Sequence, residues 1–584
     1  MSALDPIRLA VHVSHGRWFT LFASFLIMAA SGATYIFSAY SEAIKSSLGY
    51  DQHTLNTISF FKDLGANVGV LPGLVNEVAP PSAVLATGAA MNLFGYLMIY
   101  LAITGHTARP HLWQMCLYIC VGANSQAFAN TGALVACVRN FPDSRGAVLG
   151  LLKGFVGLSG AIFTQLYLAF YGGGDPKSLV LLVAWLPAAV SLVFLRTIRY
   201  LNPPPHRHQS HEFKVLCTFL YTTIALAGFL MAMIILQRRS VFTQGAYTTS
   251  SVVVLFLLLL PVAIVVREEA SDWNRGKPPV IKDGLPSEFS KSIDRTPPTV
   301  TPKKGSTPRS SSLASIFTPP KRGEDYSILQ AVVSVDMLII IVTTICGVGG
   351  TLTAIDNMGQ IGKSLGYNAE SVGTLVSLIS IWNYAGRAAA GFVSEILLVK
   401  YRLPRPLLLA LVFLLSCVGH LLIAFGGVPG SLYIASVVTG FCFGAQVPLF
   451  FAIISELFGL KHYSTLHNFG GAASPIGSYI LNVKVTGQLY DREAARQIAN
   501  GGTLSSSSSS PECVGTECFR VSFIIITAVT VVGTAVMLVL VWRTWDFYRG
   551  DIYGRCRVQR EGKKELGEKD EEMVAILEDR DRID

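Results

Sequence analysis

The sequence predicts an all-α integral membrane protein in which two parallel six-helix repeats flank two additional helices. Three observations support this prediction: only 14% of the 584 residues are charged, long apolar stretches recur along the chain, and one tetrapeptide occurs twice. A stretch of about twenty apolar residues matches a helix that crosses roughly 30 Å of hydrocarbon. Barrel strands would instead alternate over about ten residues.

The first apolar stretch, 18–40, follows a short segment, 1–17, and is too long for the core of a signal peptide. We therefore expect it to remain as the first span of the first repeat, which covers 18–199. The other five stretches of this repeat lie near 54–78, 82–104, 111–138, 145–171 and 178–197.

Two more apolar stretches occupy the region 200–266, and a basic linker, 267–326, follows them. The second repeat covers 327–545 and contains a Ser- and Cys-bearing external loop, 488–520. A charged tail, 546–584, ends the chain. The two additional stretches lie near 213–236 and 248–266, and those of the second repeat near 328–356, 368–394, 405–426, 430–455, 463–487 and 521–542, which makes fourteen predicted spans.

An ordered series of matches indicates that the two repeats arose by duplication. Ser-Leu-Gly-Tyr at 47–50 recurs at 364–367, and Gly-x-x-x-Glu at 73–77 recurs at 391–395, with offsets of 317 and 318. Three further residues, Phe141, Gly154 and Gly160, match Phe458, Gly471 and Gly477 at the first of these offsets.

The distribution of basic residues predicts the orientation. With fourteen spans and cytosolic termini, 33 of the 46 Lys and Arg lie on the cytosolic side and 10 on the external side. Cytoplasmic loops carry an excess of Lys and Arg, so this arrangement is favoured. Arg238 and Arg239, in an external loop, are discordant. The sequence does not identify which membrane contains the protein; the plasma membrane and the vacuolar membrane are the two candidates.

Parallel six-helix repeats are typical of major facilitator transporters. The phrase Gly391-x-x-x-Glu395, followed by Lys400, Arg402 and Arg405, resembles their loop motif, whereas the first copy has lost its basic residues. The stretches beginning SGATYIFSAY, LTAIDNMGQ and SELFGLKHYS resemble the plant nodulin-like, nuclear-fusion-defective group of this superfamily. The resemblance implies a transporter fold but supplies no substrate.

In major facilitators the first and fourth helices of each repeat face the central cavity. The resemblance therefore implies four ligand candidates: Tyr35, Asn124, Asn130 and Gln446. Hydrogen bonding between helices is the alternative role for each amide.

Charged groups at membrane depth are costly and mark functional sites. Lys153 lies among glycines spaced for close helix packing and either faces the cavity or extends to the interface. Asp356 either lines the external vestibule or caps its helix. His467 either packs in the core or couples transport to protons.

Four further charged residues are gating or ion-pair candidates: Glu77, Arg387, Glu395 and Glu456. Arg387 and Glu395 share a helix face, which predicts a structural ion pair, also including Glu456, or a gate that breaks during transport.

The loops carry two more predictions. The linker 267–325 has four Thr-Pro sites among many basic residues, so it is either an inert tether or a kinase substrate that binds anionic lipid when unmodified. Cys513 and Cys518 lie together in an external loop and favour a disulfide over two free thiols.

These features predict a transporter that moves a small solute. The more specific hypothesis is that this solute is an organic anion. A membrane receptor or sensor with the same fold is the alternative. The chain lacks phosphate-loop, His-Glu-x-x-His and Cys-x-x-Cys motifs. We therefore expect that the protein is not an enzyme and that it binds no metal, cofactor or nucleic acid. The expected partners are the solute and the lipid bilayer.

Overall fold

The computed structural model describes residues 5–32, 36–50, 52–172, 175–201, 209–239, 243–274, 320–367, 369–427, 430–499, 513–550 and 552. Several predictions fall outside these residues: Tyr35 as a ligand, most of the basic linker, the serine run of the external loop, and nearly all of the tail. The side chains of Arg238 and Arg239 are likewise outside the described part of the chain.

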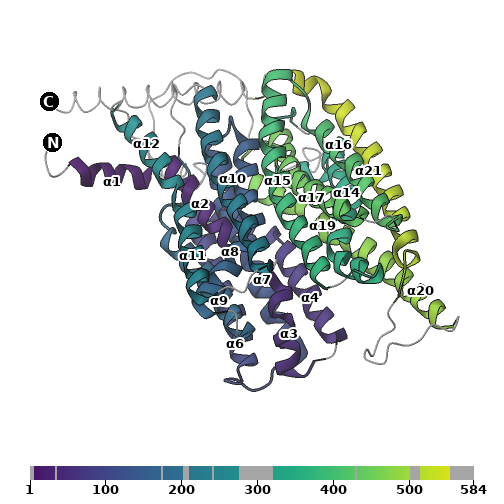
Figure 1. The fold of residues 1–584 in the computed structure, drawn as a ribbon. Coiled ribbons are helices and arrows are strands. Elements are labelled where there is room, and N and C mark those ends of the chain that lie inside the picture. Colours follow the sequence, from purple (N-terminus) through teal and green to yellow (C-terminus); the bar gives the residue numbers. More distant parts are fainter. Residues whose placement is uncertain are drawn as a thin grey trace, which may run out of the picture.

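The elements of the described chain are helices, which gather in two groups (Figure 1). Helices of the first half (purple to blue) lie mainly to one side and those of the second half (green to yellow) to the other. The first half contains α1 (Asp5–His15), α2 (Arg17–Ala30), α3 (Phe37–Leu48), α4 (Gln52–Asn67), α5 (Val70–Val78), α6 (Pro81–Ile103), α7 (Leu112–Asn140), α8 (Arg145–Tyr171) and α9 (Pro176–Val193).

The second half has a comparable set of helices, and its α17 carries an internal proline, Pro448. Its members are α13 (Ile328–Val333), α14 (Val335–Ser364), α15 (Ala369–Tyr401), α16 (Arg405–Ala424), α17 (Ser431–Leu457), α18 (Tyr463–Gly471), α19 (Ala473–Ser478), the π-helix η3 (Tyr479–Gly487), α20 (Gln488–Ala499) and α21 (Glu517–Arg549).

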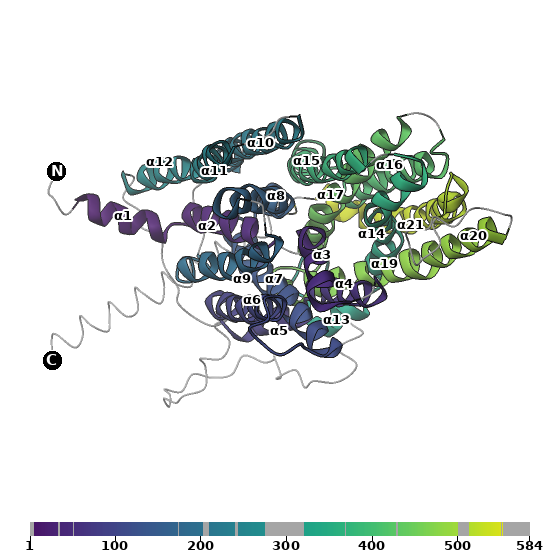
Figure 2. The same cartoon turned by 60° about the horizontal axis from the view of Figure 1, so that its bottom comes forward.

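The connecting region forms α10 (Gln209–Arg239), α11 (Gln244–Leu259) and α12 (Pro261–Asn274), which line one edge of the molecule in Figure 2. Helices α10 and α11 pack against α8, and α10 also reaches α15. There the hydroxyl of Tyr384 donates to Thr223 Oγ1 at 2.7 Å. The additional helices therefore contact both halves from outside.

Nine helices of the described chain are long and apolar enough to cross a membrane. The other five predicted spans are of two kinds. Helices α7 and α15 have 29 and 33 residues but fall outside the nine. The stretches 18–40, 54–78 and 463–487 are each divided among shorter helices. The chain is thus multi-pass, although its spans are less uniform than the sequence predicts.

The stretch 54–78, predicted as one helix, is interrupted between Asn67 and Val70. At this interruption Asn124 Nδ2 of α7 donates to the carbonyl oxygens of Gly65 (2.8 Å) and Val68 (2.7 Å). Carbonyls freed inside a membrane need such replacement partners. Asn124 therefore stabilises a helix break in this structure.

The repeated tetrapeptide ends a helix in both halves. Gly49 follows α3 with φ of 60°, and Gly366 follows α14 with φ of 81°. Only glycine adopts this left-handed conformation without a steric penalty from Cβ, which makes it the common residue just beyond a helix C-terminus. The same backbone requirement explains why both copies of the phrase have glycine at this position.

Two glycines bring α8 and α15 into direct backbone contact across the two halves. A Cβ atom on Gly150 would lie 2.9 Å from Gly391 Cα, and one on Gly391 would lie 2.6 Å from Gly150 Cα. The glycine row of α8 therefore serves close packing, and we call this contact the glycine seam.

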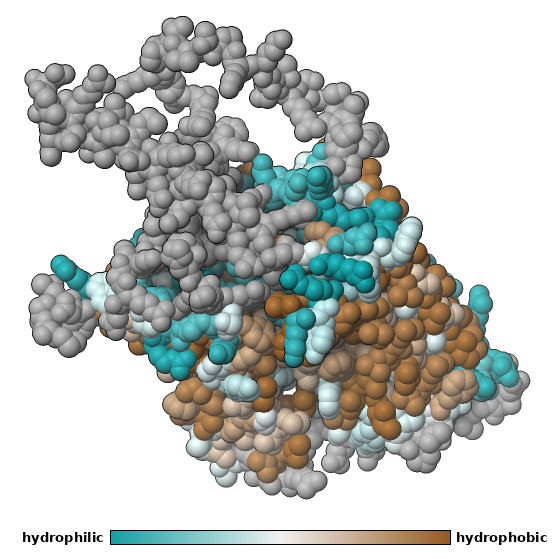
Figure 3. Space-filling model, turned by 90° about the horizontal axis from the view of Figure 1, so that it is seen from above, coloured by the Kyte–Doolittle hydropathy of each residue, from teal (hydrophilic) through white to brown (hydrophobic). Residues whose placement is uncertain are grey.

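We call the end of the bundle that carries α1 and the C-terminus of α21 the termini end, and the opposite end, which carries α20, the far end (Figure 1). Seen from the termini end in Figure 3, hydrophilic residues border a broad hydrophobic flank. Exposed apolar side chains such as Leu338, Leu411 and Val531 form the outward faces of α14, α16 and α21. Such faces suit contact with lipid.

Candidate functional site

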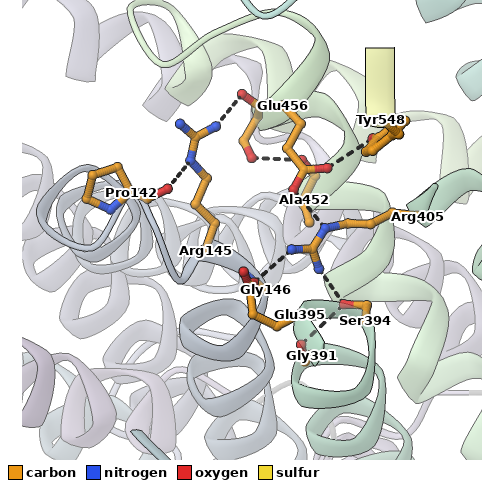
Figure 4. A network of polar contacts seen from close by, with 11 residues as sticks. Pro142, Arg145, Gly146, Gly391, Ser394, Glu395, Arg405, Ala452, Glu456 and Tyr548 are labelled. Carbon is orange, nitrogen blue, oxygen red and sulfur yellow. Dashed lines mark hydrogen bonds and ion pairs between the residues drawn. The ribbon is translucent and has the colours of Figure 1, made fainter. Parts of the chain in front are cut away.

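A buried charge network lies at the termini end (Figure 4). Arg405, the first residue of α16, is fully buried. Its Nη2 lies 2.7 Å from Glu395 Oε2, and its Nε lies 2.7 Å from Glu456 Oε1. Arg405 also donates to Ser394, and the Tyr548 hydroxyl donates to Glu456 Oε2 at 2.9 Å. Buried charges require this kind of pairing.

The network joins the two halves through the start of α8. The backbone N–H of Gly146 donates to Glu395 Oε2 at 2.9 Å, and Arg145 Nη1 donates to the Ser455 carbonyl at 2.9 Å. A carboxylate near a helix N-terminus is stabilised by the unpaired N–H groups there. Glu395 therefore holds α8 of the first half against α15 of the second.

The predicted ion pair between Arg387 and Glu395 is not formed. Arg387 donates instead to Asn383 Oδ1 (2.8 Å) and to the Lys153 carbonyl (2.6 Å). The glycine seam explains the difference, because the close approach of α8 brings a carbonyl within reach of Arg387. The side chain of Arg405 enters from α16 and pairs with Glu395. Arg405 is one of the three basic residues of the loop motif, although the sequence did not single it out from Lys400 and Arg402.

Glu77 also contacts the opposite half. Its carboxylate accepts from Ser464 Oγ at 2.6 Å and Thr465 Oγ1 at 3.2 Å, and its Oε2 lies 2.9 Å from His462 Nδ1. The sequence showed only that the basic residues after Glu77 were missing. The partners come from the start of α18, nearly four hundred residues later, and no local pattern indicates them.

Arg139 makes a third contact between the halves at the termini end. Its Nη2 donates to the Lys461 carbonyl at 2.6 Å, and its guanidinium lies 4.7 Å from the centroid of the Tyr200 ring. Burial raises the pKa of the Tyr200 phenol, which accepts a hydrogen bond from Asn76 Nδ2 at 3.0 Å. The neutral ring of Tyr200 therefore makes a cation–π interaction with the guanidinium of Arg139.

Three of the predicted ligand residues meet between the halves: Asn130, Lys153 and His467. Lys153 Nζ lies 3.5 Å from Asn130 Oδ1 and 4.8 Å from the centroid of the Phe451 ring. The His467 ring lies 5.3 Å from that of Phe451, and its Nδ1 donates to the Tyr463 carbonyl at 2.9 Å. We call Asn130, Lys153, Phe451 and His467 the central cluster.

Lys153 is the cation of the central cluster. Among the described residues, no carboxylate lies within ion-pair distance of its Nζ. It points at an aromatic face and an amide oxygen instead, and Arg387 contributes a second positive charge nearby. An uncompensated cation in this position favours the binding of an anion.

The remaining candidates lie elsewhere. Gln446 Oε1 accepts from Thr351 Oγ1 at 3.0 Å within the second half, and its Nε2 is buried without a partner in the described structure. Asp356 lies toward the far end beside Asn482. Cys513 and Cys518 form a disulfide at the start of α21.

Comparison with known proteins identifies relatives of both halves. A family model described as Nodulin-like matches residues 17–266, and one described as NFD4, C-terminal domain, matches residues 327–549. The Arabidopsis thaliana protein NUCLEAR FUSION DEFECTIVE 4 is 27% identical over 91% of this chain and 89% of its own length. A probable transporter, MCH1 of Yarrowia lipolytica, is 26% identical over 33% of this chain and 38% of its own.

A solved structure gives the fold. The major facilitator proton:xylose symporter XylE, bound to 6-bromo-6-deoxy-D-glucose, superposes with a TM-score of 0.53. The match covers 90% of this chain and 95% of the symporter, with 12% identity. The chain therefore shares the fold of this symporter.

Proposed function

Because the first half matches the Nodulin-like family model and the second half matches the NFD4 C-terminal domain model, we propose that this chain moves a small organic anion across a membrane by alternating access. The observation that carries the proposal is Lys153. It lies where the two halves face each other and has no carboxylate partner among the described residues.

The central cluster has groups suited to a carboxylate. An ammonium group and an amide can bind carboxylate oxygens, while the rings of Phe451 and His467 exclude water beside them. Charge-assisted hydrogen bonds are about twice as strong as neutral ones, so Lys153 would dominate recognition. In the alternative interpretation, Lys153 extends to an interface and the solute is neutral.

The polar contacts between the halves support alternating access. Those made by Arg139, Arg145, Glu395 and Glu77 gather at the termini end, which they hold closed. We propose that they break together when the halves rock and the central cluster opens to that side. We further propose fourteen crossings in two parallel repeats, with the termini end in the cytosol.

Uptake into proteoliposomes tests the function. Purified protein would be supplied with radiolabelled pyruvate, malate, citrate and benzoate, and with D-xylose as the neutral probe. Saturable uptake of a carboxylate, together with exchange against the same unlabelled compound, is expected. Uptake of D-xylose alone would overturn the anion assignment. Binding of a carboxylate without exchange would indicate a receptor rather than a transporter.

A further inference from the structure

A second polar group lies toward the far end, apart from the central cluster. Asp356 of α14 accepts from Asn482 Nδ2 at 3.4 Å, and Asn482 Oδ1 accepts from Asn357 Nδ2 at 2.7 Å. Asp356 lies eight residues before the end of α14, or roughly 12 Å from it at 1.5 Å per residue. It is therefore too deep in the helix to cap its C-terminus.

Among the described residues, the charged groups that interact with Asp356 are Asp63 and Lys62, adjacent residues of α4 in the other half. Lys62 Nζ lies 2.8 Å from Asp63 Oδ1, so this cation already has a carboxylate partner. The single charged residue of η3, Lys484, lies 5.7 Å from the centroid of the Tyr479 ring on its own helix.

The helix that supplies Asn482 has an unusual backbone. Residues Tyr479–Gly487 form a π-helix of nine residues, continuous with α19 before it and α20 after it. π-Helical segments are rare, generally limited to a single turn, and frequent at functional sites. Here the segment places the Asn482 amide between Asp356 and Asn357. The local geometry is thus organised around the carboxylate of Asp356.

An exposed carboxylate at this depth is stable only while water reaches it. Asp356 is exposed in this structure, whose halves are joined at the termini end. If the halves close at the far end, water leaves, and an ionised carboxylate that has no ion pair among the described residues becomes costly. Protonation removes that cost, whereas Asp63 keeps its ion pair with Lys62.

We propose that Asp356 is the proton-binding group that couples solute movement to a proton gradient. A proton from water at the far end forms an O–H bond with the carboxylate, and the neutral acid then permits closure of that end. When the termini end opens, the O–H bond breaks and the proton returns to water on the other side. An anion carried in the same step makes the movement electroneutral, which is how this inference rests on the proposed function.

Proton binding can be measured without any solute. The full-length protein in unbuffered nanodiscs is shifted between about pH 8 and about pH 5 in the presence of an indicator dye. Asp356→Asn is expected to take up about one proton fewer per chain than the wild type. Asp356→Glu should match the wild type. Asp63→Asn, the neighbouring carboxylate with its own cation, is the matched control and should also match it.

Infrared spectroscopy provides the second readout, because only a protonated carboxylic acid has a free-acid C=O stretching band. This band should grow on acidification in the wild type and in Asp63→Asn, and its growth should be weaker in Asp356→Asn. Equal proton uptake and equal bands in Asp356→Asn and the wild type would overturn the inference. A failure of carboxylate transport would not alter this measurement, so the two proposals can fail separately.

Discussion

Arg405 and Glu395 form an ion pair of 2.7 Å whose two side chains are almost completely closed off from solvent. The pair lies at the termini end, where Glu395 also accepts the N–H of Gly146 from the other half. Two functions therefore meet in one carboxylate: it neutralises a buried guanidinium, and it holds the halves together.

Arg405→Ala should be strongly destabilising, because it removes the cation that pairs with both Glu395 and Glu456 and leaves the two carboxylates buried together. Breaking a buried pair costs roughly 3–5 kcal/mol. A matching fall in the thermal midpoint in detergent would check this. Arg402→Ala removes an exposed arginine whose one side-chain hydrogen bond to the described residues is with the Gly550 carbonyl, and it should leave the midpoint nearly unchanged. Equal effects of the two substitutions would contradict the assignment.

Glu77→Gln should weaken the same end of the molecule by a smaller amount. The glutamine still accepts from Ser464 but loses its charge attraction to His462, and both partners are partly exposed. A loss of roughly 1–2 kcal/mol follows, measurable by thermal unfolding. Glu517→Gln, at a solvent-exposed ion pair with Arg520, is the control and should change little. A larger loss of stability for Glu77→Gln than for Arg405→Ala would contradict this ranking and would show that Glu77 makes the stronger contact between the halves.

Lys153→Gln should weaken carboxylate uptake about ten- to a hundred-fold in apparent affinity, because one charge-assisted contact is worth roughly 1.5–3 kcal/mol. Lys153→Arg should lose less, since the charge remains. The measurement is the concentration dependence of radiolabelled uptake, with Lys484→Gln as the exposed control on η3. Normal transport by Lys153→Gln would show that this lysine does not contact the solute.

The disulfide predicts which thiols a membrane-impermeant maleimide can reach. Added from outside, the reagent should label the protein only after reduction, and then at Cys513 and Cys518 alone. The mass shift on a gel counts the labels, and Cys513→Ser with Cys518→Ser removes them. Labelling of the unreduced double variant from outside would mean that another cysteine faces that side.

Epitope tags test the proposed crossings. Tags at the N-terminus, near residue 300 and at the C-terminus should bind antibody only after the cytosolic side is opened. Each tag reports one side directly, so a residue-300 tag exposed on intact cells would refute the even number of spans between the repeats.

Sequence alone predicted the helical class, the family and the general positions of the helices. These properties depend on long apolar stretches and on sequence motifs that can be recognised without a structure. It also singled out Asn130, Lys153 and His467, which the fold brings together. It named Arg405 among the basic residues that follow Glu395 but could not choose it over Lys400 and Arg402, and it gave no partner for Glu77. Those contacts depend on how helices distant in sequence are rotated against one another, and no periodicity within one helix records that rotation.

The interruption at Asn67 escaped prediction for a related reason. The residue that stabilises it, Asn124, belongs to another helix. A polar amide in an apolar helix is consistent with a ligand contact and with a structural cap alike, and only the neighbouring carbonyls distinguish the two roles.

The glycine seam has a thermodynamic consequence. Gly150 and Gly391 have no side chains, so joining α8 to α15 at this point freezes no rotamers and loses no side-chain entropy. A contact between larger residues would have to be reordered at each closure and would bind the halves more firmly once formed. Backbone against backbone can come together and separate many times at little cost, which suits the proposed rocking of the two halves.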